Sequence, residues 1–186
     1  VGRHERGRRP RSSSLAGLGR RSWVPQRTRK GRASEWLRGF LPSSLGVSGS
    51  ERLRGCCGAL TGLLLTGLLC SQILGAEAAS PMLIAPMGAS AVLLFAVPAS
   101  PLAQPWSIMG GNVVSALIGV TCARWVGDPL LAAPLAVALA IGTMFALRCL
   151  HPPGGAVALT AVLGGPAVAA AGYGFALAPV ALNSLV

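Results

Sequence analysis

The charged residues of this 186-residue chain lie almost entirely in its first 54 positions. Of its 16 lysines and arginines, 14 lie at or before Arg54. The side chains with a fixed charge in residues 55–186 are Glu77, Arg124, Asp128 and Arg148. A soluble domain is roughly one quarter charged and covers its surface with such side chains. Residues 55–186 cannot form a water-facing surface of that kind, so we predict that they lie in lipid.

Residues 1–34 form a basic tail of Arg, Ser, Gly and Pro without apolar periodicity, and we predict that it is disordered. The net charge of +11 comes from this tail rather than from a folded domain, which argues against nucleic acid as a partner. We favour the interpretation that the tail is not a native segment, because the chain begins with Val and uses 15 Arg to one Lys. An organelle transit peptide over Arg3–Arg32 is the alternative.

The cysteines give no sign of a disulfide framework or a metal site. None of the five forms a C-x-x-C pair, and all lie in or beside apolar stretches, where Cys behaves as a small apolar side chain. The chain also lacks paired carboxylates and the H-E-x-x-H and G-x-S-x-G motifs. We therefore expect no catalytic residue, no metal and no cofactor, and we do not expect an enzyme.

Three apolar stretches are long enough to cross a bilayer, which takes about 20 helical residues. They are residues 55–75, 106–126 and 130–150. The basic residues up to Arg54 place the start of the first stretch on the cytoplasmic side. This stretch also has glycines at positions 55, 58, 62 and 67, which leave one helix face small enough for close packing in lipid.

Two further apolar segments are interrupted by proline and glycine. Residues 81–97 are broken near Pro86, and a second break lies at Pro152 and Pro153, so we expect a short helix to start at each break. The last apolar run, residues 173–186, is too short to span. The predicted fold is an all-α, polytopic transmembrane helical bundle with four or five spanning helices, in which the broken segments either span or re-enter the membrane. The alternative is that each break is a tight loop at the membrane surface.

The two broken segments resemble each other. Ala85–Ala91 and His151–Val157 align at an offset of 66 residues, with Pro and Gly in matching positions. A spanning helix precedes each copy, and an apolar segment with an asparagine follows it, Asn112 in the first and Asn183 in the second. We therefore predict an internal repeat of helix, broken segment and helix. Paired broken helices in two repeats are a common design of secondary transporters.

The two breaks also indicate a binding site, since irregular backbone at membrane depth is tolerated where protein buries it or a cavity adjoins it. Helix N-termini offer free N–H groups and partial positive charge, which favour an anion. His151 can change its charge near neutral pH, and ionisable groups in or near lipid are functional candidates. The predicted anion-binding residues are Gly88, Ala89, Ser90, Asn112, Arg148, His151, Gly154 and Gly155.

Several of these side chains also have a structural interpretation. The alternatives are that Arg148 marks a membrane interface and that His151 caps a turn. For Asn112 we slightly favour a hydrogen bond between helices over a place in a pathway. Arg124 and Asp128 lie four residues apart near a helix end, and we expect them to form a surface pair.

The same motifs are similar to those of a known family. His151-Pro152-Pro153 followed by Gly154-Gly155-Ala156 resembles the signature of the HPP family of integral membrane proteins. Residues 85–95, Gln104-Pro105-Trp106 and Gly111-Asn112 are similar to the same family. The resemblance covers residues 35–186. It implies a compact domain with four transmembrane helices and a role in nitrite transport, and it implies that bacterial members often carry regulatory CBS domains after the membrane part.

We therefore expect residues 35–186 to form an HPP-type transmembrane domain, truncated at its C-terminus. The predicted function is a transporter or channel for a small inorganic anion, and the resemblance makes nitrite the expected substrate. The alternative is a non-transporting membrane anchor or sensor that signals to a soluble CBS-type domain or partner. The expected partners are the lipid bilayer, a small anion and a second copy of the chain. The expected location is the bacterial inner membrane, with a plastid membrane as the alternative.

Overall fold

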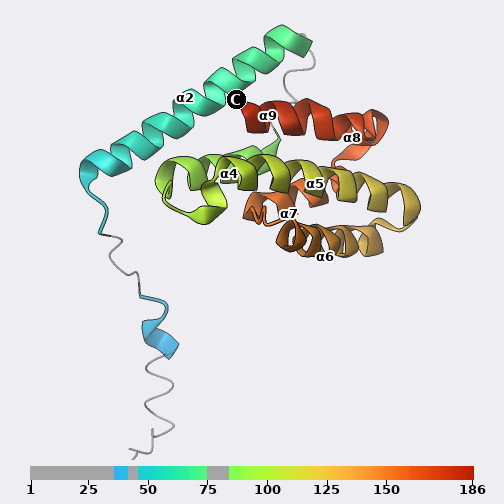
Figure 1. The fold of residues 1–186 in the computed structure, drawn as a ribbon, viewed down its shortest axis with the longest axis horizontal. Helices are drawn as coiled ribbons and strands as arrows, with labels where there is room; N and C mark the ends of the chain where they lie inside the picture. Colours follow the sequence, from blue (N-terminus) through green and yellow to red (C-terminus); the bar gives the residue numbers. More distant parts are fainter. Residues whose placement is uncertain (1–35, 42–45, 75–83) are drawn as a thin grey trace, which may run out of the picture. The chain divides into compact units, whose positions relative to one another are not determined.

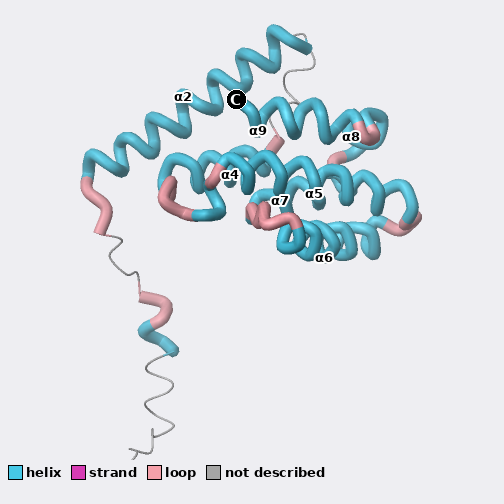
Figure 2. Tube along the Cα trace, viewed as in Figure 1, coloured by secondary structure: helices cyan, strands magenta, loops and turns pink. Residues whose placement is uncertain are grey.

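The structure is a computed structural model that describes residues 36–41, 46–74 and 84–186. Two units are separate in it, residues 1–45 and residues 46–186, and each is described by itself. In the first unit, residues 36–38 form a helical turn, and the ring of Trp36 packs edge-on against Phe40. The predicted disordered tail, residues 1–34, lies outside the described residues. Every regular element of the described residues is helical (Figure 2).

The first long helix of the second unit, α2 (Gly49–Leu74), begins six residues before the predicted start. Ser48 and Glu51 form a capping box there: the Ser48 N–H donates to Glu51 Oε2 at 2.8 Å, and the Glu51 N–H donates to Ser48 Oγ at 3.3 Å. A capping box satisfies N–H groups that the first helical turn leaves free. The polar cap therefore extends the helix beyond its apolar stretch.

The next helices all begin with proline in their first turn, where its fixed φ suits a helix and its missing N–H costs nothing. They are α4 (Ala85–Ala96), the short 3-10 helix η1 (Pro101–Ala103), α5 (Pro105–Trp125) and α6 (Pro129–Ala146). The predicted helix start near Pro86 is confirmed. The carboxylate of Asp128 also caps α6 by accepting the Leu130 N–H at 2.9 Å.

α6 ends four residues earlier than the sequence predicts, and the reason is a Schellman motif. Arg148 has a φ of +55°, its N–H donates to Phe145 O at 3.2 Å, and the Cys149 N–H donates to Met144 O at 2.9 Å. This pair of bonds satisfies the last carbonyl groups of a helix and requires a residue in the left-handed region, which is usually glycine. The chain leaves α6 here and turns toward His151.

The C-terminal part of the chain contains the second broken segment. It consists of α7 (Pro152–Leu163), α8 (Gly165–Ala171), a π-helical segment η2 (Ala176–Ala181) and α9 (Leu182–Leu185). The helix start predicted at Pro152 is confirmed. A break at Gly164 bends α7 and α8 by 95°. By length and composition, α2, α5 and α6 can each cross a membrane, and the bent pair of α7 and α8 would make a fourth span. The sequence predicts four or five spanning helices, so prediction and structure agree only if the bent pair counts as one span.

α5 is the central helix of the second unit, and more than half of its span is buried inside the protein. α6 and α7 pack against it and against each other, while η2 and α9 contact it from the C-terminal part of the chain (Figure 1). The contacts are made by small residues, and Ala132, Ala136 and Ala140 of α6 are fully buried. Small side chains let helix backbones approach closely in lipid, where no hydrophobic effect drives helices together. This arrangement brings the starts of α4, α5 and α7 into one neighbourhood.

Candidate functional site

His151 is a fully buried ionisable residue at the start of α7, and both of its ring nitrogens have a partner. Nδ1 lies 2.8 Å from Leu102 O, and Nε2 lies 2.9 Å from Ser90 Oγ. A carbonyl oxygen only accepts hydrogen bonds, so Nδ1 must carry a hydrogen and donate it to Leu102. In the neutral ring, Nε2 is then an acceptor, and the Ser90 hydroxyl donates to it.

Three separate elements meet at this histidine. Ser90 lies on α4, Leu102 lies in η1, and His151 itself is the residue before the first turn of α7. Ser90 and His151 are 61 residues apart in the chain. The two broken segments predicted from the sequence are therefore in direct contact, and their only ionisable side chain forms that contact.

Ser90 also forms part of the wall of a cavity of about 90 Å³, and His151 does not. α2 and α4 provide most of its wall, and Ile108 of α5 and the last residues of the chain complete it. Its polar residues are Thr66, Ser90, Asn183 and Ser184. The Thr66 hydroxyl donates to Gly62 O in its own helix at 2.8 Å. No charged residue of the described part of the chain belongs to the cavity wall, where hydroxyl and amide groups provide the polarity.

Asn112 joins this polar group from α5. Its Nδ2 donates to Ser184 Oγ at 3.1 Å, and its Oδ1 is buried without a hydrogen-bond partner. The neighbouring Asn183 accepts a hydrogen bond from the Cys70 thiol at 3.0 Å. Asn112 therefore connects two helices, as we favoured, and it also holds a side chain of the cavity wall. An unsatisfied buried acceptor costs about 1–3 kcal/mol, and a bound hydrogen-bond donor would offset that cost.

The predicted glycines have packing roles rather than a common ligand. A Cβ on Gly154 would lie 2.7 Å from Ser115 Oγ and 3.0 Å from Gly111 O, so this glycine lets α7 pack closely against α5. A Cβ on Gly155 would make only an ordinary contact, and one on Gly88 would meet nothing within 4 Å. Ala89 is exposed and faces away from the cavity wall that α4 forms.

The prediction of a free N–H group at Gly154 is wrong, because this N–H donates to His151 O at 2.9 Å. The two helical residues before it are prolines, which have no N–H to offer. Beyond the first three positions of a helix, backbone N–H groups have partners within that helix. This applies to Gly155, Gly88 and Ser90. The polar side chains, rather than the helix N-termini, are therefore the groups available to a ligand.

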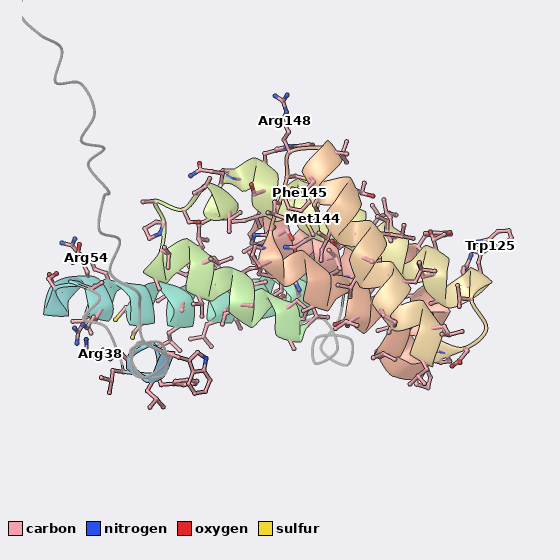
Figure 3. The ribbon with its side chains drawn as sticks, turned by 90° about the horizontal axis from the view of Figure 1, so that it is seen from below. Arg38, Arg54, Trp125, Met144, Phe145 and Arg148 are labelled. Carbon is pink, nitrogen blue, oxygen red and sulfur yellow. The ribbon has the colours of Figure 1, made fainter. Side chains whose placement is uncertain are left out.

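Arg148 does not contribute to the cavity. Its side chain is exposed and points away from the helices, whereas the side chain of Met144, one turn earlier, is buried among them (Figure 3). Arg124 and Asp128 do not form the predicted pair. The Arg124 guanidinium lies 5.0 Å from the centre of the Tyr173 ring, while Asp128 caps α6.

Sequence reasoning missed four groups at this site: Thr66, Phe95, the Leu102 carbonyl and Ser184. The sequence gives a signal for two of them: Thr66 is one of the few polar residues in the apolar stretch of α2, and Ser184 follows Asn183, the asparagine noted after the second broken segment. Nothing in the sequence indicated that the Leu102 carbonyl would bind His151, because this contact depends on where η1 lies in the fold. Among the described residues, no group of three or more His, Cys, Asp or Glu residues is placed to hold a metal ion.

The chain matches a family model described as "HPP, transmembrane region" over residues 44–186, which is more than half of its length. It is 39% identical over 110 residues to a transmembrane protein of Dictyostelium discoideum, covering 57% of this chain and 38% of that protein. It is 38% identical over 128 residues to a second transmembrane protein of the same organism, covering 67% of this chain and 40% of that protein. The chain thus spans about two fifths of the length of these relatives. No solved structure matches it.

Proposed function

Because the chain belongs to the HPP family of integral membrane proteins, we propose that it is a transporter or channel for a small inorganic anion. Nitrite is the first substrate to test. The observation that carries this proposal is the cavity behind Ser90, which lies among apolar helices and has a buried histidine one hydrogen bond away. Polar groups and ionisable side chains inside a membrane domain are costly, and they mark the pathways of ions and small substrates.

The size of the cavity favours a small ion over an organic substrate. A volume of about 90 Å³ exceeds the roughly 10–15 Å³ that a single water molecule needs, and it is far below the roughly 300–1,000 Å³ of sites for organic ligands. The chemistry of the wall favours an anion. Among the residues that the structure describes, no carboxylate is part of it, and the Ser184 hydroxyl, which accepts a hydrogen bond from Asn112, can donate one to a ligand.

The proposed pathway lies between α2 and α4, and it replaces the helix N-termini as the site of the anion. Ala91 is the position at which this can be tested, because it is buried and forms part of the cavity wall. Ala91→Leu adds three carbon atoms to the wall of this small cavity and should narrow it. Ala89→Leu makes the same change on the same helix, at an exposed position outside the wall, and is the matched control.

The test is efflux from proteoliposomes that contain the purified chain and are loaded with potassium nitrite. Nitrite that leaves the vesicles is measured with a diazo-dye reaction. We expect efflux well above that of protein-free liposomes, a loss of most of it in Ala91→Leu, and rates close to wild type in Ala89→Leu. If wild-type protein gave no more efflux than empty liposomes, the proposal would fail and the anchor or sensor function would be favoured.

The proposed orientation places the start of α2 in the cytoplasm, because Arg52 and Arg54 lie there and are exposed. The bacterial inner membrane is the proposed location, with a plastid membrane as the alternative. A cysteine at Ser50, in a chain whose exposed Cys56 and Cys57 are changed to Ser, would report the side. A membrane-impermeant maleimide should label it only after the cell membrane is opened. Labelling in intact spheroplasts would show that the start of α2 lies on the outer side of the membrane and would contradict the proposed orientation.

A further inference from the structure

We propose that His151 and Ser90 couple the anion to a proton, so that one proton moves with each anion through the cavity. This inference rests on the proposed function and states what drives the transport, namely the movement of a proton with the anion. The observations that carry it are the two hydrogen bonds of the buried imidazole and the place of Ser90 in the cavity wall, to which the ring itself does not belong.

Only one nitrogen of His151 can exchange its proton. The Leu102 carbonyl fixes a hydrogen on Nδ1 whether the ring is neutral or charged, since a carbonyl oxygen cannot donate. Nε2 therefore gains and loses the proton, and it faces Ser90 Oγ at 2.9 Å. Because the ring is fully buried and Ser90 is part of the cavity wall, a proton reaches Nε2 from the cavity through the hydroxyl.

The protonation state of His151 decides what Ser90 offers to the cavity. When Nε2 is unprotonated, the Ser90 O–H donates to it, and the oxygen presents only lone pairs to the cavity, which repel an anion. When Nε2 is protonated, it donates to Ser90 Oγ, and the hydroxyl hydrogen is free to turn toward the cavity and donate to an anion. Uptake of one proton thus changes this part of the wall from an acceptor into a donor and places a positive charge behind it.

Charge balance gives the second reason for coupling. A single unpaired charge is costly in a low-dielectric interior, whereas an imidazolium and an anion together carry no net charge. The proton comes from the water on one side, stays on Nε2 while the anion is bound, and returns to water on the other side with the anion. In this step the Ser90 O–H bond breaks as its hydrogen passes to Nε2, and it forms again with the proton from the cavity. The net change is one N–H bond, and no electron is transferred.

No other side chain in the elements around His151 is placed to hold this proton. α4, the connector 97–104 and α7 contain no titratable residue. The titratable residues of α5, Cys122 and Arg124, lie near its C-terminal end, and α6 has only Asp128, before its first residue. In the segment before α7, Arg148 is exposed and Cys149 is a buried thiol. A histidine is the side chain that titrates between about pH 5 and pH 8.

The experiment measures initial rates of nitrite uptake into proteoliposomes under two driving forces, with the rate of protein-free liposomes subtracted because nitrous acid crosses lipid unaided. One force is a pH gradient, acidic outside, and the other is an inside-positive potassium diffusion potential set with valinomycin. For wild type we expect the pH gradient to accelerate uptake severalfold per pH unit, because the rate rises with the protonated fraction of His151, and we expect the potential to have no effect.

Two variants test the residues. His151→Asn keeps an amide donor for the Leu102 carbonyl and removes the nitrogen that titrates, so uptake should lose its response to pH and respond to the potential. Ser90→Ala separates the ring from the cavity wall and should reduce uptake at acidic pH severalfold. Ser107→Ala is the matched control, because this buried hydroxyl donates to Pro101 O and is not part of the cavity wall.

The outcomes separate the two proposals. Wild-type uptake that follows the potential and ignores the pH gradient would overturn the coupling and leave anion transport standing. Equal pH responses in wild type, His151→Asn and Ser90→Ala would also overturn it. Absence of any protein-dependent uptake would overturn the proposed function itself. If His151→Asn elutes as aggregate in size-exclusion chromatography, Ser90→Ala alone decides, since it removes only one oxygen atom.

Discussion

α4 and α7 start from the same sequence pattern but have different surroundings. Both are 12 residues long and carry proline in the first turn, with glycine soon after. α7 packs between α5 and α6, and its Gly154 is in tight contact with Ser115 and Gly111. α4 packs against α2 and forms part of the wall of a cavity. A Cβ added at its Gly88 would have no neighbour within 4 Å. Proline and glycine thus indicate where a helix begins, but not whether its glycine is needed for packing.

The roles that we propose for the two helices differ as well. α7 contributes a histidine that is held rigidly by two neighbours, whereas α4 contributes the serine that stands between this histidine and the cavity. One copy of the pattern is a packed support and the other is a wall that a ligand can touch. The predicted internal repeat stays a prediction, but if it exists, its two copies have diverged in this way.

The strongest test of the difference in packing between α7 and α4 is a substitution at Gly119, the residue of α5 on which α7 packs. A Cβ there would lie 2.6 Å from Ala161 Cβ and 2.7 Å from Ala158 O, so Gly119→Leu must push α7 away from α5. We expect a loss of more than about 3 kcal/mol, enough to prevent assembly of the domain. Fluorescence-detected size-exclusion chromatography should show aggregate. Gly88→Leu, the control on α4, should elute as wild type, and equal damage from both would remove the distinction.

A smaller change at Gly154 tests the same packing within α7. Gly154→Ala should lower the free energy of unfolding by about 1–3 kcal/mol, because its Cβ would overlap Ser115 Oγ. Ser115→Ala in the same chain removes that oxygen and should restore part of the loss. Thermal unfolding in detergent measures both. If the double variant is no more stable than Gly154→Ala alone, the contact with Ser115 is not the cause.

On α4, the corresponding substitution should have the opposite sign. Gly88→Ala meets no neighbour, and alanine is favoured over glycine within a helix by about 0.5–1 kcal/mol. We expect a rise in unfolding temperature and unchanged nitrite flux, measured on the same preparations as Gly154→Ala. A destabilised Gly88→Ala would mean that α4 is packed as tightly as α7.

The smallest expected effect is at Arg148, which leads into α7 in a left-handed conformation. Arg148→Gly should stabilise the protein by about 0.5 kcal/mol, since glycine adopts this φ without a steric cost but loses more chain entropy on folding. Arg148→Ala removes the charge and keeps the strained φ, so it should give no gain. A gain in both variants would assign the effect to the charge instead.

Much of the fold could be predicted from the sequence because proline and apolar length act locally. The starts of α4 and α7 follow from Pro86 and Pro152, and the spans of α2 and α5 follow from uncharged stretches. The early end of α6 could not be predicted, because it depends on an arginine in a conformation that usually needs glycine.

The candidate site could be predicted only in part. Ser90, Asn112 and His151 were chosen because polar residues are rare in an apolar chain, and the structure brings them to one neighbourhood. Their partners depend on tertiary packing over long sequence distances, as the 61 residues between Ser90 and His151 illustrate. The donor role assigned to Gly154 failed because a proline-rich first turn leaves few free N–H groups.

α2 is far less buried inside the protein than α5, so we expect it to be the cavity wall that moves more easily. Only 11% of its span is buried, against 56% for α5. It rests on α4 through the ring of Phe95, which fills the space left by Gly58 and Gly62, and on the end of the chain through the Cys70 thiol, a weak hydrogen-bond donor. Sliding over a flat ring breaks no backbone hydrogen bond. A change in bilayer thickness, which an exposed helix can accommodate by tilting, is therefore expected to change the width of this cavity.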